Sequence, residues 1–252
     1  MKTSNRQKAV SFTGGFETGA LNLLDYLHPT KYIEHEVIAP DGVAGMAGLL
    51  SILPEGSPKP NIVRAIEDGD IVFTHTEYNF FGRQVAIDIF RFEDGLIVEH
   101  WDNIQEFAAP NPSGRTMIDG TTEVKDIDRT EVNKTLVRSF VDDVYVHGRL
   151  DKLHGYFNGD NYIQHSPSIP DGVSSFEKQL TELKAQGTKY QTIHKVIGEG
   201  NFVLVLSEGQ HNQKHTAFYD LFSVENGKIA EHWDLIMEIQ PKETWKNNNG
   251  KF

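Results

Sequence analysis

The sequence predicts an α+β fold in two tandem copies within one chain of 252 residues. Three observations lead to this prediction: short motifs recur at a nearly constant offset, the first half of each copy has helical periodicity, and the second half alternates as strands do. Helical segments followed by antiparallel strands are typical of a sheet with helices packed on one face. We therefore expect two such units, each with its own core.

The repeat consists of four motifs that recur in the same order. The first two return at an offset of 162 − 32 = 130 residues, and the last two at 220 − 88 = 132. The pairs are Tyr32–His35 with Tyr162–His165, Pro40–Val43 with Pro170–Val173, Asp88–Phe90 with Asp220–Phe222, and Glu99–Asp102 with Glu231–Asp234. A preserved order with so small a drift indicates a duplication rather than chance matches.

The copies are separated by a stretch typical of a linker. Residues 109–114 read Ala-Pro-Asn-Pro-Ser-Gly, and runs of proline, glycine and asparagine mark loops. We place copy one at 1–110, a linker at 111–128, copy two at 129–245 and a tail at 246–252. The tail contains three successive asparagines, and we expect it to fray.

The first half of each copy is predicted to be helical. In copy two, apolar residues from Val132 to Val144 fall at helical spacing, with Thr130 as the expected N-cap. A short helix is expected over 150–157, and a third begins after Pro170–Gly172. In copy one, three glycines at 14, 15 and 19 weaken the first helix, because glycine disfavours helical backbone.

The second half of each copy is predicted to form an antiparallel sheet. The expected strands are 62–67, 71–78, 84–92 and 96–107 in copy one, and 192–197, 202–209, 215–224 and 228–239 in copy two. Residues 93–95 and 225–227 end in glycine and are expected to form hairpin turns. A three-residue turn would set Asp88 opposite His100 and diagonal to Asp102, whereas a two-residue turn would set it against Trp101. The sequence leaves both registers open.

Composition excludes several classes of function. With no cysteine, the chain has no disulfide, thiolate nucleophile or cysteine-bound zinc, which favours a reducing, cytoplasmic location. The net charge of −12 disfavours binding to nucleic acid or to an anionic membrane surface. No apolar run reaches the length of a membrane span, and the first eight residues do not resemble a signal peptide.

Four aspartates are the candidate catalytic groups. Asp88 and Asp220 share strand faces with Phe90 and Phe222, and a carboxylate among aromatic rings is costly unless it is paired or faces a cavity. Asp102 and Asp234 follow on the next strands, and each shares a face with a histidine. Burial and a like-charged neighbour would raise the pKa of one aspartate and make it an acid/base near neutral pH. The alternative is a set of hydrogen-bonded structural groups.

Five histidines are candidate ligand-binding residues, together with Phe90 and Phe222. His100 and His232 share faces with the aspartates, His35 and His165 follow the Tyr-Ile-x motif, and His75 corresponds to Leu206 in copy two. A functional His75 would make the two sites different. The spacing of His211 and His215 is that of a helical metal site, but both are expected in a strand or loop. We therefore expect no metal.

These motifs resemble the SnoaL-like family of the nuclear transport factor 2-like superfamily. The resemblance rests on Tyr162–Pro167, Pro170–Gly172, Asp220-x-Phe222 and Asn226–Asp234. It spans about residues 130–240, and residues 32–105 of copy one with gaps. Copy one departs from it at Glu36-Val37-Ile38, where copy two has Ser166-Pro167.

The resemblance implies cone-shaped α+β barrels, each a curved antiparallel sheet wrapped by helices around an apolar pocket. The best-known members are polyketide cyclases that close a ring by intramolecular aldol condensation without metal or cofactor. The aspartate matching Asp102 or Asp234 is their acid/base, and the residue fourteen earlier, at Asp88 or Asp220, also lines the pocket (102 − 88 = 14). This spacing favours the three-residue turn and a shared face. The superfamily also contains isomerases, dehydratases and non-catalytic binding modules, so the fold does not fix the reaction.

Three functional hypotheses follow. The first is a cofactor-independent acid/base enzyme acting on a small hydrophobic carbonyl compound, of the cyclase, isomerase or dehydratase type. The second is a binding module for a small apolar ligand, in which the aspartates are fixed by salt bridges or turned away from the pocket. In the third, one copy serves mainly as a structural partner. Single-copy relatives commonly dimerise through their sheets, so the two copies are expected to form an intramolecular pseudo-dimer, and a further homodimer stays open.

Overall fold

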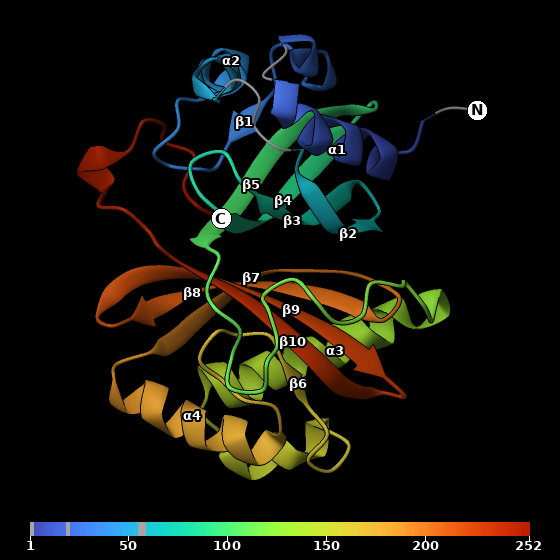
Figure 1. Ribbon diagram of the computed structural model, residues 1–252, viewed down its shortest axis with the longest axis vertical. Helices are drawn as coiled ribbons and strands as arrows, with labels where there is room; N and C mark the ends of the chain where they lie inside the picture. The colour runs from blue at the N-terminus through green and yellow to red at the C-terminus, as the bar shows by residue number, and fades with distance from the viewer. Residues whose placement is uncertain (1–2, 19–20, 55–58) are drawn as a thin grey trace. The chain divides into compact units, whose positions relative to one another are not determined.

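The structure, a computed structural model, describes residues 3–18, 21–54 and 59–252 (Figure 1). The chain forms two compact units. The first comprises Met1–Glu106 together with Ile239–Phe252, and the second comprises Phe107–Glu238. Both are α+β, which confirms the predicted fold class of two tandem domains. Among the described residues, no helix combines the length and the hydropathy that a membrane crossing requires.

The two units repeat the same order of elements. The first contains α1 (Asn5–Gly14), η1 (Gly15–Thr18), η2 (Leu21–Tyr26), β1 (Ile33–Glu34), α2 (Gly42–Ile52), β2 (Asn61–Asp68), β3 (Ile71–Tyr78), β4 (Gln84–Glu93), β5 (Leu96–Glu106) and, near the C-terminus, η6 (Lys242–Thr244). The second contains η3 (Ile127–Arg129), α3 (Thr130–Phe140), η4 (Val141–Val146), η5 (Leu150–Tyr156), β6 (Ile163–Gln164), α4 (Val173–Ala185), β7 (Lys189–Glu199), β8 (Phe202–His211), β9 (Lys214–Glu225) and β10 (Lys228–Glu238).

Each unit has a five-stranded sheet, in the order β1-β5-β4-β3-β2 or β6-β10-β9-β8-β7. The sheets are mixed rather than purely antiparallel, because the short β1 runs parallel to β5 and β6 runs parallel to β10. These short strands carry the Tyr-Ile-x-His motifs. Their pairing places residues 34 and 164 beside His100 and His232.

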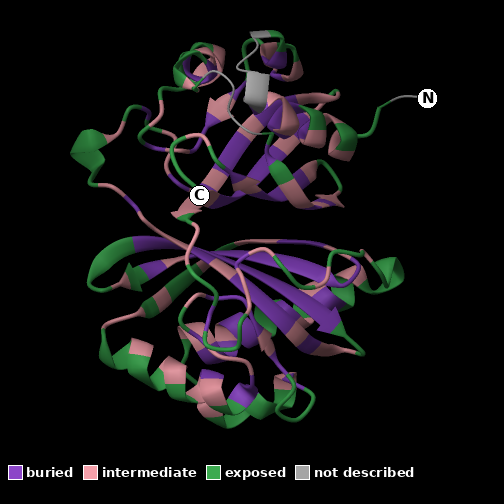
Figure 2. Cartoon of the chain, in the orientation of Figure 1, coloured by how far each residue is buried: buried purple, intermediate pink, exposed green. Residues whose placement is uncertain are grey.

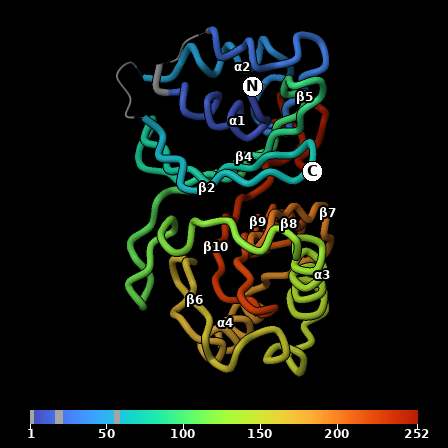
Figure 3. Tube along the Cα trace, turned by 90° about the vertical axis from the view of Figure 1, so that its right-hand side faces the viewer, coloured from blue at the N-terminus to red at the C-terminus, as the bar shows by residue number. Residues whose placement is uncertain are grey.

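Helices cover one face of each sheet, and the core lies between them (Figures 2 and 3). The same aromatic contact anchors both units: Phe12 of α1 packs edge-on against Phe90, and Phe140 of α3 against Phe222, each at 5.6 Å between ring centroids. All four rings are at most 1% exposed. Burying one phenylalanine fully contributes about 1.5–3 kcal/mol, so these pairs secure the helices to the sheet.

The helix ends follow local chemistry. Ser4 and Gln7 form a capping box at the start of α1, which ends at Gly14 and continues only as the short 3-10 turn η1. This end agrees with the prediction from Gly14 and Gly15, whereas Gly19 lies outside the described residues. Thr130 is not the N-cap. It is the first residue of α3, and its hydroxyl donates to the Ile127 carbonyl and accepts from the Gly200 amide.

The β4–β5 and β9–β10 hairpins have two-residue turns, yet the aspartates still share a face. Asp94 and Gly95 have φ of 52° and 80°, and Asn226 and Gly227 have 52° and 73°, the backbone that such turns require. A bulge after each turn shifts the strand pairing by one residue. As a result, Asp88 lies directly opposite Asp102. The three-residue turn favoured by the resemblance is therefore wrong, and so is the opposition of Asp88 to His100.

The segments that follow β5 and β10 are repeat elements rather than a linker and a frayed tail. In the second unit, Asn111 Nδ2 donates to the carbonyls of Gln164 and Ile169, at 2.7 and 2.8 Å. In the first unit, Asn247 Nδ2 donates to the carbonyls of Glu36 and Ala39, at 2.9 and 3.0 Å. The sequences Asn-Pro-Ser-Gly-Arg and Asn-Asn-Asn-Gly-Lys correspond at an offset of 247 − 111 = 136. Each extension thus belongs to the unit that does not contain the strand it follows.

We predict that Asn247→Ala lowers the free energy of unfolding by on the order of 1–3 kcal/mol, because it removes both side-chain hydrogen bonds to the carbonyls of Glu36 and Ala39. Asn247 is 6% exposed, whereas its neighbour Asn248 is exposed. Asn248→Ala is therefore the matched control and should unfold like the wild type in urea. Equal midpoints for both variants would show that the extension does not stabilise the first unit.

Candidate functional site

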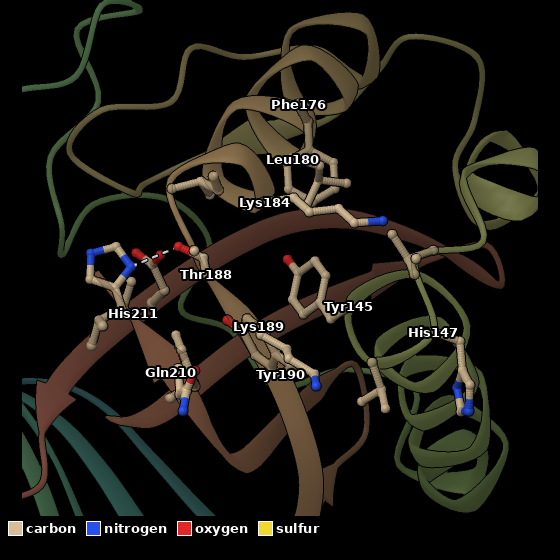
Figure 4. Close-up of a pocket in the computed structure, with 18 of the residues that line it drawn as sticks. Tyr145, His147, Phe176, Leu180, Lys184, Thr188, Lys189, Tyr190, Gln210 and His211 are labelled. Atoms are coloured by element: carbon tan, nitrogen blue, oxygen red, sulfur yellow. Dashed lines mark hydrogen bonds between the residues drawn. The ribbon is translucent and has the colours of Figure 1, made fainter. Parts of the chain in front are cut away.

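A pocket of about 520 Å³ opens in the second unit between α4, η4 and the sheet (Figure 4). This volume lies in the range of pockets that hold small organic ligands. Its wall is mostly apolar, formed by Val144, Leu150, Ile169, Phe176, Leu180, Leu183, Phe218 and Ile236. The polar side chains that reach it include Asp234, His232, Tyr145 and Tyr190.

Asp234 is the carboxylate of this pocket. It lies on β10 directly opposite Asp220 of β9 and is surrounded by protein, yet it keeps some solvent-accessible surface through the pocket. Burial raises the pKa of Asp234 above its usual value, and the nearby charge of Asp220 adds to this, whereas His232 acts to lower it. A carboxyl with a raised pKa is a stronger base once it is ionised.

Asp220 is held by hydrogen bonds beneath the pocket. It is 1% exposed, and its Oδ1 lies 2.9 Å from His232 Nε2 and 3.3 Å from the Tyr190 hydroxyl, which donates to it. His232 Nδ1 lies 3.1 Å from Gln164 Oε1, and its ring stacks on Phe222. Gln164, His232 and Asp220 therefore form a buried chain that orients the polar end of the pocket.

Tyr145 and Tyr190 are pocket residues that the sequence prediction missed. Their rings lie 4.7 Å apart between centroids, and burial raises the pKa of both well above the usual value. Both hydroxyls thus stay protonated at neutral pH and can donate hydrogen bonds. Tyr145 lies in the π-helical segment η4 that continues α3. A π-helical turn changes which side chains face inward, and no pattern of apolar spacing would have indicated it.

The corresponding cluster of the first unit is fully paired. His100 Nδ1 lies 3.0 Å from Glu34 Oε1, and its Nε2 lies 3.3 Å from Asp88 Oδ1. Burial alone would lower the pKa of His100, but the carboxylates of Glu34 and Asp88 raise it well above its usual value. The ring is an imidazolium fixed between two anions. Tyr78 donates a further hydrogen bond to Asp88 Oδ2 at 2.9 Å.

Asp102 is paired with a buried lysine from the C-terminal extension. Lys251 is 3% exposed, and its Nζ lies 3.4 Å from Asp102 Oδ1 and 2.6 Å from Glu36 Oε2. Burial alone would lower the pKa of Lys251, but Asp102 and Glu36 raise it, so it remains an ammonium. Asp88, His100 and Asp102 offer atoms within 4.8 Å of one another that could ligate a metal. Here the two cations, Lys251 and His100, neutralise those carboxylates instead.

The second unit lacks this pairing. The residue at the position of Glu36 is Ser166, and the residue at the position of Lys251 is Arg115. The Arg115 guanidinium lies 3.2 Å from Asp171, so it is bound to a different carboxylate. Asp234 therefore keeps a pocket-facing carboxyl, whereas Asp102 is held in an ion pair.

The other predicted histidines lie away from the aspartates. His35 stacks on Trp101 and His165 on Trp233, at 4.5 and 4.6 Å between centroids. Both tryptophans alternate with the aspartates along their strands, so they point to the opposite sheet face. His165 is also bound by Asp119 and Glu231. These two histidines pack on the sheet face opposite the aspartates, and neither is among the residues lining the pocket.

His75, Phe90 and Phe222 are also structural in this geometry. His75 pairs with Ile87, the neighbour of Asp88, and so lies on the face opposite that aspartate, with its Nδ1 3.1 Å from Arg64 Nη1. Phe90 and Phe222 are core residues that stack on His100 and His232 at 5.0 and 4.7 Å. They orient the histidines rather than contact a ligand.

No family model and no curated protein sequence matches the chain. Solved structures do. TsrD from Streptomyces laurentii has 22% identity and a TM-score of 0.36, over 42% of this chain and 91% of its own. A SnoaL-like polyketide cyclase from Agrobacterium tumefaciens has 13% identity and a TM-score of 0.35, over 42% and 91%. An NTF2-like protein of unknown function from Cytophaga hutchinsonii has 18% identity and a TM-score of 0.36, over 47% and 95%.

The pH dependence of stability tests the paired cluster of the first unit. Burial, and then the charge of Asp102, raise the pKa of Glu36 from 4.5 to about 7. Between these values the folded state binds more protons than the unfolded state, so the unfolding free energy falls as pH rises. We predict that Glu36→Gln removes this decline, measured by urea unfolding from pH 4 to 8.

The control for this experiment is Glu243→Gln, because Glu243 is exposed in η6. Its pH profile should run parallel to that of the wild type. A Glu36→Gln profile that also runs parallel would show that Glu36 has an ordinary pKa in the folded protein.

Proposed function

We propose that the second unit binds a small hydrophobic carbonyl compound and acts on it by cofactor-independent acid/base chemistry, with Asp234 as the acid/base. The observation that carries this proposal is one carboxyl of raised pKa at the polar end of an apolar pocket of about 520 Å³. Such a combination is frequent at catalytic sites. The resemblance to polyketide cyclases supports the same class of substrate.

The chemistry begins with removal of a proton from the carbon next to the substrate carbonyl. Ionised Asp234 accepts this proton, and the negative charge moves to the carbonyl oxygen as an enolate. Tyr145, whose hydroxyl points into the pocket in Figure 4, donates a hydrogen bond to that oxygen. Protonated Asp234 then returns the proton, either to the new alkoxide of an aldol product or to another carbon. Ring closure, isomerisation and dehydration share this first step.

Asp220 and His232 are positioning residues in this mechanism. Asp220 lies opposite Asp234 and contributes to raising its pKa. It is buried, is hydrogen-bonded to His232 and Tyr190, and is not among the residues lining the pocket, so it is not the group that exchanges protons with the substrate. Replacing Asp220 should therefore change the pH profile of turnover.

The first unit, in contrast, fits the role of structural partner. A unit without catalysis, such as a binding module, was expected to have its aspartates fixed by salt bridges or turned away. Asp88 is bound to His100, and Asp102 to Lys251. We propose that catalysis is confined to the second unit.

Two matched substitutions test this proposal. Asp234→Asn should lower the exchange of α-hydrogen for deuterium in a panel of aryl ketones by about a hundredfold or more, the usual contribution of a general base. Asp102→Asn should leave exchange unchanged, because Asp102 is bound by Lys251. NMR in D₂O measures both. Equal exchange by wild type and Asp234→Asn would refute the catalytic role, and a ketone that binds without exchange would indicate a binding module.

A further inference from the structure

Basic residues outnumber acidic ones around the pocket of the second unit, although acidic residues are in excess over the whole chain. The chain carries 36 acidic and 24 basic residues. Asp234 is nevertheless the only acidic residue among those lining the pocket, whereas His147, Lys184, Lys189 and His211 all reach it. An excess of basic groups at one pocket of an acidic protein indicates a ligand with negative charge.

The two lysines lie at the entrance, on either side of one turn. Lys184 is near the end of α4 and Lys189 begins β7. Both are exposed, and neither forms an ion pair with any residue in the described part of the chain. Lys184 extends across the entrance, because its Nζ lies 3.5 Å from where a β-carbon on Gly148 would be. Figure 4 shows its ammonium over the open space.

Two acidic residues on the elements around the entrance already have partners. Glu182 of α4 pairs with Lys178, and Glu208 of β8 pairs with His194 and His215. Of the two histidines at the entrance, His147 is bound to Asp142, and His211 is held by the Thr188 hydroxyl at 3.0 Å. Lys184 and Lys189 are thus the cations available to a ligand.

We infer that the compound bound here carries a carboxylate at the end opposite its reacting carbonyl. This inference rests on the proposed function, which places the carbonyl at Asp234. Apolar side chains such as Phe176, Leu180 and Phe218 separate the two ends. A carboxylate is attracted to Lys184 and Lys189 and repelled by Asp234. The charges therefore fix which way round the ligand enters.

Paired probes test the inference: a 4-aryl-4-oxobutanoate and its methyl ester, which differ only in charge. Wild-type protein should bind the acid at least about fivefold more tightly than the ester at low ionic strength, and added salt should reduce the difference. The double variant Lys184→Gln/Lys189→Gln should bind both compounds equally. The control is Lys178→Gln on the same helix, which is outside the pocket lining and should keep the preference.

Calorimetric titration measures these affinities, and circular dichroism verifies that each variant is folded. Equal binding of acid and ester by the wild type, binding of neither, or a preference that survives in the double variant would overturn the inference. These outcomes are independent of the proposed catalysis. If the acid preference is absent but Asp234→Asn abolishes deuterium exchange, only the inference fails. If the preference depends on the lysines but Asp234→Asn exchanges normally, only the catalytic role fails.

Discussion

The structure of both units depends on two carboxylates that face each other across neighbouring strands. Asp88 lies opposite Asp102, and Asp220 lies opposite Asp234. Two like charges at this distance, on a face that also carries buried aromatic rings, destabilise the fold unless cations or donors compensate them. The other polar residues of each cluster reduce this repulsion between the carboxylates, and the two units use different residues to do so.

Three substitutions separate the two solutions. Glu34, Glu36 and Lys251 of the first unit correspond to Gln164, Ser166 and Arg115 of the second. Glu34 raises the pKa of His100 and so favours its cationic form, and Lys251 brings a second cation to Asp102. Gln164 is neutral, and Arg115 turns to Asp171, so less positive charge reaches Asp234. Part of the electrostatic cost remains as the raised pKa of Asp234, which is the property that acid/base chemistry needs.

The sequence predicted the duplication, the α+β class and most strands, because these follow from motif order and alternation along the chain. It also predicted that Asp88, His100 and Asp102 lie on one face of the sheet. It did not predict their register, since the bulge after each turn has no distinct residue signature. The Tyr-Ile-x-His motif indicated His35 and His165 as ligand-binding residues. Strand alternation, however, places the tryptophans on which they stack on the sheet face opposite the aspartates.

The extensions after β5 and β10 could have been recognised from the sequence. Their Asn-x-x-Gly pattern recurs with a basic residue after the glycine, and both glycines have a φ of 79°. The offset of 136 differs from the 130 to 132 of the other motifs, so the match lies outside the main repeat. Composition favoured a linker and a frayed tail, whereas the asparagine side chains bind these segments to backbone carbonyls of the two units.

Removing the lysine would not by itself turn the first unit into a second copy of the pocket. Tyr78 of β3 is 4% exposed and donates its hydroxyl hydrogen to Asp88. The strand registers place Gly209 of β8 at the equivalent position. There a β-carbon would lie only 2.0 Å from the Lys189 carbonyl oxygen, so the close approach of β7 requires glycine. The two units therefore differ both in the charge around the aspartate and in the side chain that occupies the space beside it. The aspartate of the first unit is thus ion-paired with Lys251, whereas the carboxyl of Asp234 lines a pocket.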